Sequence, residues 1–216
     1  PNSWVETNPD VRFFDTMPGI DAAPEFKGKA LWPTARSGYR NWVIVDLKTA
    51  KEAVLTSHQG SVGRVVKVDL DRKRLYYLAR TESNPFLEQF WMCGLDGKNP
   101  KRLTDGKLNY SVSADDQGFG ITGQSVDQAP IRSKIDFEGV VTSPPAPSTG
   151  AASRTERFRF KSMDGKYELY GLLSKPANFD PAKKYPMILD VYGGPESCGY
   201  SEAFNRPSGY SNQGYL

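Results

Sequence analysis

The stretch Leu75-Tyr76-Tyr77-Leu78-Ala79-Arg80, followed by Phe90-Trp91-Met92-Cys93-Gly94-Leu95, decides the fold class of this sequence. Both runs are short and rich in aromatic residues, and charged or turn-forming residues bound them, which is typical of β-strands. Between them and a third short strand at 101–104, Asp96-Gly97-Lys98-Asn99 predicts a tight turn. Long helical patterns are not evident, so the sequence predicts a mainly β, antiparallel protein.

The same order of elements occurs earlier in the chain, with strands predicted at 30–35, 42–47 and 53–56. Ala35-Arg36 and Ala79-Arg80 lie 44 residues apart, and Leu55-Thr56 and Leu103-Thr104 lie 48 apart. A repeat of this length with about four short strands is typical of propeller blades. A third, less regular unit is predicted from strands at 110–113, 119–122 and 131–135, and Trp4–Thr7 and Val11–Phe14 are predicted to complete a preceding blade.

A change of composition marks a domain boundary after the third unit. Residues 142–155 are rich in Pro and Ser and predict a linker that cannot pair in a sheet. We therefore assign residues 1–141 to the C-terminal blades of a partial β-propeller and residues 156–216 to the beginning of an α/β domain. In the latter, a hairpin is predicted at 156–174 around Met163-Asp164-Gly165, and the apolar run Met187–Tyr192 predicts a strand covered on both faces.

Length, charge and cysteine content exclude several classes of protein. The chain has 216 residues, a net charge of +3 without a basic block, and two cysteines, Cys93 and Cys198. Nucleic acid is therefore not an expected partner, and neither a disulfide framework nor a zinc site is expected. No stretch approaches the roughly 18 apolar residues of a membrane span. Because about three blades cannot close a ring, and the chain starts without Met or a signal peptide, we expect a part of a longer protein.

His58 is the single histidine, so a catalytic triad must use it or draw its histidine from outside this chain. His58 lies between predicted strands and is expected to pack rather than to catalyse. The nearest match to a nucleophile elbow, Gly199-Tyr200-Ser201-Glu202-Ala203, lacks the final glycine, and Ser201 is expected to be an ordinary loop residue. Asp69 and Asp71 are predicted to be turn residues. Arg36 and Arg80 recur at matching places in two blades, so they are expected to line a pore or to form a structural ion pair rather than to bind substrate.

Tyr192-Gly193-Gly194-Pro195 directly follows the predicted buried strand, where loops of α/β domains hold ligands. Two glycines allow the backbone to turn sharply beside a bound group. A tyrosine hydroxyl at this point could stabilise a developing oxyanion. The alternative is a simple turn with the Tyr192 ring packed beneath it, and the spacing alone leaves both interpretations open.

Several of these motifs together resemble the dipeptidyl peptidase IV family of the prolyl oligopeptidase clan. They include Leu31-Trp32 with Arg36–Arg40, Leu95-Asp96-Gly97 with Lys101–Thr104, Tyr110–Ser113, and Phe179-Asp180-Pro181 with Leu189–Pro195. The resemblance implies a serine exopeptidase in which a propeller precedes an α/β-hydrolase domain and N-terminal dipeptides, often X-Pro or X-Ala, are released. It implies a catalytic role for Tyr192, whose hydroxyl donates to the oxyanion, with the backbone of Gly193 and Gly194 in the substrate loop.

The resemblance also defines what this chain lacks. The family's nucleophile, Asp and His are expected in sequence beyond this chain, and its acidic pair in earlier propeller sequence, so the chain alone is expected to be inactive. No cofactor and no metal are expected. The implied partners are peptides with a free N-terminus, the remainder of the same polypeptide and a second copy in a homodimer. The sequence does not determine the compartment, and the resemblance points to an extracytoplasmic location.

Two alternatives remain open. The chain could belong to a propeller binding module without catalysis, because propellers and hydrolase-like folds both occur in proteins that are not enzymes. It could also belong to a related endopeptidase or acylaminoacyl peptidase. A Gly-x-Ser-x-Gly motif beyond this chain would favour an enzyme, and an acidic pair in the propeller would favour dipeptide release.

Overall fold

The computed structural model describes residues 28–81, 84–147, 153–191, 202–204, 210 and 213–216. The chain divides into two compact units, Pro1–Asp116 and Gln117–Leu216, which are described separately. The described residues contain β-strands and no α-helix, as predicted for a mainly β chain, so no helix that could cross a membrane is found among them. The α/β layer of the second domain remains a prediction.

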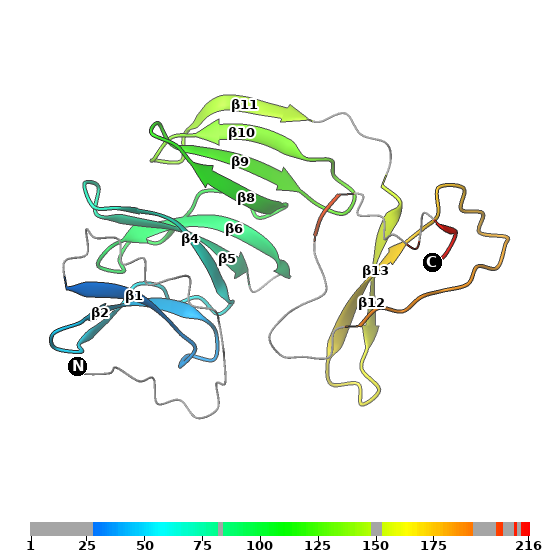
Figure 1. The fold of residues 1–216 in the computed structure, drawn as a ribbon, viewed down its shortest axis with the longest axis horizontal. Helices are drawn as coiled ribbons and strands as arrows, with labels where there is room; N and C mark the ends of the chain where they lie inside the picture. The colour runs from blue at the N-terminus through cyan, green and yellow to red at the C-terminus, as the bar shows by residue number, and fades with distance from the viewer. Residues whose placement is uncertain (1–27, 82–83, 148–152, 192–201, 205–209, 211–212) are drawn as a thin grey trace. The chain divides into compact units, whose positions relative to one another are not determined.

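The strands form three antiparallel sheets and one hairpin in chain order (Figure 1). The first sheet contains β1 (Lys29–Thr34), β2 (Asn41–Asp46) and β3 (Glu52–Val54). The second contains β4 (Val62–Asp69), β5 (Arg74–Thr81), β6 (Asn84–Gly94) and β7 (Lys101–Arg102). The third has the order β11-β10-β9-β8, with β8 (Asn109–Ala114), β9 (Phe119–Gln124), β10 (Ile131–Ile135) and β11 (Val141–Pro147). Consecutive antiparallel meanders, two of them four-stranded among the described residues, are typical of propeller blades, which confirms the β-propeller part of the predicted fold class.

The hairpin consists of β12 (Thr155–Lys161) and β13 (Glu168–Ser174), joined by the predicted turn at Gly165. In its register Phe158 faces Gly171 and Phe160 faces Leu169, so the aromatic side chains share one face. The Phe158 and Phe160 rings stack with centroids 5.8 Å apart, and both side chains are more than two-fifths exposed. Arg157 and Arg159 alternate with them and occupy the opposite face.

Two strands were not predicted. β4 was missed because its pairing with β5 shifts register twice between Val62 and Lys67, which breaks the alternation that marks a strand. β11 contradicts the expectation that residues 142–155 cannot pair, because its prolines lie at the edge of the sheet, where a missing N–H removes no bond to a further strand. The predicted strands at Trp4–Thr7 and Val11–Phe14 lie outside the described residues.

The core of the first unit lies between its two sheets. β5 is one of the two inner strands of the second sheet. It is buried on both faces, since Leu75 to Ala79 are each at most 4% exposed. One face of β5 packs against the first sheet, and the other carries the Tyr76 ring, which stacks with Phe90 at 6.2 Å. The cluster between the sheets contains Trp42, Ile44, Leu55, Val62, Leu75, Tyr77, Ala79 and Cys93.

A buried amide side chain joins the start of β2 to the chain that follows β3. Asn41, at the start of β2, accepts hydrogen bonds through Oδ1 from the Thr56 hydroxyl and from the His58 N–H, both at 2.9 Å. Its Nδ2 donates to the His58 carbonyl at 3.1 Å. Thr56 Oγ1 in turn accepts from the Trp42 N–H at 2.8 Å. Asn41 thereby ties the beginning of β2 to the chain that leaves β3.

The second sheet repeats this arrangement with glutamine in place of asparagine. Gln89 Oε1 accepts from the Thr104 hydroxyl at 2.8 Å and from the Gly106 N–H at 2.9 Å, and Nε2 donates to the Leu108 carbonyl at 2.6 Å. Thr104 Oγ1 accepts from the Phe90 N–H at 3.1 Å. The amide, the threonine and the two backbone N–H donors recur at the 48-residue spacing of the sequence repeat, whereas the carbonyl that accepts from the amide nitrogen lies two residues further along in the second network. We call each set of contacts an amide–threonine network.

The turn after β6 touches the first sheet. Gly97 has a φ of 76°, and a Cβ at this position would lie 2.3 Å from the Val54 carbonyl oxygen. The turn therefore requires glycine for two reasons, the left-handed backbone and the close approach of β3.

We expect Thr104→Val to lower the free energy of unfolding by about 1–3 kcal/mol, because Gln89 Oε1 loses a donor and the Phe90 N–H loses its acceptor in a buried site. Urea denaturation of the protein measures the change. Thr142→Val, the same substitution on exposed β11, is the control and should change it by less than about 0.5 kcal/mol. Equal effects at the two threonines would contradict a special role for the network.

We expect Gly97→Ala to destabilise the protein by about 1–3 kcal/mol more than Gly165→Ala. Both glycines have φ above 70°, but a Cβ at Gly165 has nothing within 4 Å. The difference between the two losses in free energy of unfolding therefore reports the close approach of Val54 and Leu55 to Gly97. No difference would show that the turn can move away from β3 at no cost.

Candidate functional site

The residues predicted to form the site, Tyr192, Gly193 and Gly194, lie outside the described residues. The structure does describe the chain on either side of them, up to Val191 and again from Glu202 to Phe204. Both flanking segments belong to the second unit.

A compact turn leads toward the predicted site. The Asp180 N–H donates to the Tyr185 hydroxyl at 2.8 Å, and Asp180 Oδ1 accepts from the Ala182 N–H at 3.0 Å. The Tyr185 ring lies 5.2 Å from the Phe179 ring, and Lys175 Nζ lies 4.8 Å from the centroid of Phe179. Residues 179–186 therefore form a turn that is held by contacts within the turn, chiefly those of the Asp180 carboxylate and the Tyr185 hydroxyl.

Residues 187–191 do not form the predicted buried strand. They have no strand assignment, and the side chains of Met187, Leu189 and Val191 are 65%, 73% and 74% exposed. The Ile188 N–H donates to the Leu216 carbonyl at 2.9 Å, and the Leu216 N–H donates to the Pro186 carbonyl at 3.0 Å. A strand covered on both faces needs neighbouring strands and layers above and below, and the described residues supply only this short contact.

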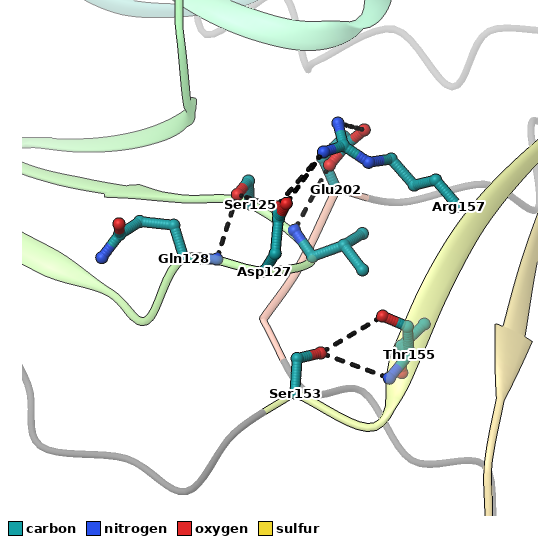
Figure 2. A network of polar contacts seen from close by, with 8 residues as sticks. Ser125, Asp127, Gln128, Ser153, Thr155, Arg157 and Glu202 are labelled. Carbon is teal, nitrogen blue, oxygen red and sulfur yellow. Dashed lines mark hydrogen bonds and ion pairs between the residues drawn. The ribbon is translucent and has the colours of Figure 1, made fainter.

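Arg157 connects two carboxylates of the second unit (Figure 2). Its Nη1 lies 3.2 Å from Glu202 Oε1, and its Nη2 lies 3.2 Å from each oxygen of Asp127. Glu202 Oε2 accepts from the Val126 N–H at 3.3 Å. The Asp127 side chain also accepts from the Ser125 hydroxyl at 2.8 Å. We call Arg157, Asp127 and Glu202, with the Val126 N–H, the Arg157 network.

The network is built around a buried carboxylate, and a single guanidinium faces two acidic side chains. The Glu202 side chain is only 1% exposed, whereas those of Arg157 and Asp127 are 42% and 70% exposed. Hydrogen bonding from Ser125 and the positive charge of Arg157 lower the pKa of Asp127 below its usual value, so this carboxylate is ionised at neutral pH. A buried carboxylate is costly without a partner, and the guanidinium of Arg157 can serve both acids because its donors point in a planar fork.

Sequence analysis did not single out the Arg157 network. Asp127, Arg157 and Glu202 are far apart in the sequence, and no spacing relates them. Glu202 lies within the pentapeptide Gly199–Ala203, which was considered only for its serine, and Ser201 lies outside the described residues. The one available signal was the alternation in β12, which places Arg157 on the polar face of the hairpin.

In the first unit, His58 has the packing role that was predicted. His58 Nε2 is hydrogen-bonded to the Tyr77 hydroxyl at 2.9 Å, and its ring meets the Trp91 ring edge-on at 4.7 Å. Burial raises the pKa of Tyr77, so this phenol stays protonated. A neutral phenol and an indole edge hold the imidazole in place, as expected of a structural histidine.

The other residues considered for chemistry are also structural where the structure describes them. Cys93 is buried, and burial raises the pKa of its thiol to about 11, so no reactive thiolate forms at neutral pH. Asp69 accepts from the Arg72 N–H at 2.8 Å in a turn, as predicted. Arg36 pairs with Glu52 at 2.6 Å, which is the structural ion pair of the two roles considered for it. Among the described residues, no group of acidic, histidine or cysteine side chains could hold a metal ion. Cys198 lies outside them.

Sequence comparison links the chain to known proteins. The family model of the dipeptidyl peptidase IV (DPP IV) N-terminal region matches residues 1–126. A probable dipeptidyl-aminopeptidase B of Emericella nidulans is 30% identical over 94% of this chain, and one of Aspergillus clavatus is also 30% identical over 94%. The chain spans 23% of the length of either relative.

Solved structures show the same fold. The dipeptidyl peptidase 4 of Porphyromonas gingivalis matches with a TM-score of 0.67 and 17% identity, over 87% of this chain and 28% of that protein. A putative dipeptidyl aminopeptidase IV of Bacteroides ovatus matches with a TM-score of 0.64 and 20% identity, over 87% of this chain and 31% of that one. Since the family model covers more than half of the residues, and the sheets agree with these structures, the chain belongs to the dipeptidyl peptidase IV family.

Proposed function

We propose that the complete protein is a serine-type dipeptidyl peptidase that releases N-terminal dipeptides, often X-Pro or X-Ala, from peptides with a free N-terminus. The observation that carries the proposal is the family match over residues 1–126. Relatives named dipeptidyl-aminopeptidase B, which align with 94% of the chain, support the same activity.

Tyr192 is the residue of this chain to which we assign a part in the reaction. When a serine oxygen attacks the scissile carbonyl carbon, an electron pair moves onto the carbonyl oxygen, which becomes an oxyanion. The Tyr192 hydroxyl donates a hydrogen bond to that oxygen, and a preorganised donor of this kind stabilises the transition state more than the ground state. Gly193 and Gly194 let the backbone approach the substrate without a side chain between them.

The remaining catalytic groups belong to parts of the protein outside this chain. The single histidine, His58, is engaged with Tyr77 and Trp91 in the first unit, and the sequence contains no Gly-x-Ser-x-Gly. The nucleophile and its base account for most of the rate in triad enzymes. The chain alone therefore holds one catalytic group and is inactive by itself.

In the complete protein, we expect Tyr192→Phe to lower kcat on an Ala-Pro chromogenic substrate by about 10²–10³-fold, because one oxyanion donor is lost. The steady-state release of the chromophore measures it. Tyr170→Phe is the matched control, since the Tyr170 hydroxyl donates to Glu168 on the exposed face of β13, and its kcat should stay within about twofold of wild type.

The isolated 216-residue chain serves as the blank in this assay and should release no chromophore. Release by the isolated chain would contradict the assignment of the triad to other parts of the protein. An unchanged kcat in Tyr192→Phe would contradict the role of the hydroxyl.

A further inference from the structure

The turn between β9 and β10 is closed by its own hydrogen bonds. The Ser125 N–H donates to the Gln128 carbonyl at 3.2 Å, and the Gln128 N–H donates to Ser125 Oγ at 3.1 Å. Ser125 and Val126 are buried, whereas the Asp127 side chain is 70% exposed. The Val126 N–H bonds outside the turn, to Glu202 Oε2. The turn therefore offers one carboxylate and one N–H, in fixed positions, to other segments of the chain.

The β12–β13 hairpin gains little from apolar burial. In β12 only Thr155 is buried, and residues 156–161 are exposed. The Phe158 and Phe160 rings stack on each other, and both side chains are more than two-fifths exposed. A two-stranded hairpin is at best marginally stable alone, and burial of apolar surface is the usual force that fixes it on a neighbour. The position of this hairpin therefore depends on its polar contacts.

Arg157 makes such a contact across the predicted domain boundary at 142–155 (Figure 2). Its guanidinium extends from β12 and bonds both oxygens of Asp127 on the β9–β10 turn. It also pairs with Glu202 Oε1, while the other oxygen of Glu202 accepts from the Val126 N–H of the same turn. Three segments of the second unit therefore meet at one guanidinium.

The two arms of the network differ in exposure and therefore in strength. Glu202 is only 1% exposed, so removal of Arg157 would leave a buried negative charge uncompensated, which is costly. Asp127 and Arg157 are both well exposed, so water and dissolved salt weaken the attraction between them. The arm to Glu202 is consequently the strong one, and the arm to Asp127 is weak and sensitive to salt.

We propose that the Arg157 network is a two-armed latch that holds the β12–β13 hairpin against the turn between β9 and β10. The arm to Glu202 sets where the hairpin lies, and the arm to Asp127 makes the strength of attachment depend on ionic strength. Without Arg157 the hairpin moves away from the third sheet as an intact element, because β12 and β13 remain paired through their backbones. The latch does not depend on the peptidase activity proposed above.

Two backbone amides report directly on the latch. The Val126 N–H bonds to Glu202, and the Phe204 N–H bonds to Gln124 Oε1 at 3.2 Å, so each loses its partner when the segments separate. In the complete protein, we expect Arg157→Gln to raise the hydrogen-exchange rate of both amides by about 10- to 100-fold. Mass spectrometry with fragmentation to single residues measures these rates.

Amides inside the hairpin distinguish its detachment from its unfolding. The Ser162 N–H donates to the Tyr167 carbonyl near the turn, and the Lys175 N–H donates to the Arg154 carbonyl at the open end. In Arg157→Gln, the exchange rates of both amides should stay within about twofold of wild type. A rise at Ser162 and Lys175 equal to that at Val126 would show that the hairpin melts, and would overturn the latch.

Arg159→Gln is the matched control. Arg159 lies on the same face of β12 as Arg157, but its partner at 3.6 Å is Glu168, within the hairpin. The same chemical change at this position should leave the exchange of Val126 and Phe204 unaltered. A comparable rise in Arg159→Gln, or no rise in Arg157→Gln, would contradict the latch.

Further variants test the two arms separately. Glu202→Gln added to Arg157→Gln removes the uncompensated charge, so exchange of the Val126 amide should return to within about fivefold of wild type. No recovery in this double variant would contradict the role of the buried arm. Asp127→Asn alone should raise the exchange rate by only about two- to threefold.

Salt provides the last test of the exposed arm. In the wild-type protein, raising NaCl from about 0.05 M to about 0.5 M should speed exchange of the Val126 amide by about two- to threefold. Asp127→Asn should lose this response, since the screened pair no longer exists. Equal salt responses in the wild-type protein and in Asp127→Asn would overturn the assignment of the salt-sensitive arm to Asp127.

Discussion

The first unit depends on a simple constraint, that a buried carboxamide must satisfy its donors and its acceptor. Asn41 and Gln89 are both almost fully buried. The side-chain oxygen of each accepts hydrogen bonds from a threonine hydroxyl and from a backbone N–H. The threonine then accepts from the residue that follows the amide. Because these bonds form only if the strands are in one register, the network selects that register, and the apolar core can pack against a sheet of defined geometry.

The repeat in the sequence predicted most strands of the first unit, but not the amide–threonine networks that hold them in register. Leu55-Thr56 and Leu103-Thr104 were visible as a recurring pair, and their spacing indicated blades. The partners of the threonines were hidden, because Asn41 and Gln89 are different residues and a single sequence does not reveal that they are equivalent. The strands that escaped prediction, β4 and β11, break local rules through register shifts and prolines, which pairing with a neighbouring strand can tolerate.

In the second unit, sequence patterns predicted one element correctly and another wrongly. The hairpin β12–β13 was predicted because alternation and a Gly turn are local signals. The apolar run at 187–191 gave an equally clear pattern, yet burial of a strand depends on neighbours that a pattern cannot supply. The Arg157 network joins residues from three distant segments, and ion pairs of this kind are set by tertiary structure alone.

The amide–threonine networks have a consequence for how the protein is made. The hydroxyl bond of each amide joins residues only 15 positions apart in the chain. Contacts with such short sequence separation form early and quickly, because little loop entropy is lost in closing them. During synthesis each sheet can secure its internal polar bonds soon after its last strand leaves the ribosome, so the protein can fold one blade at a time from its N-terminus.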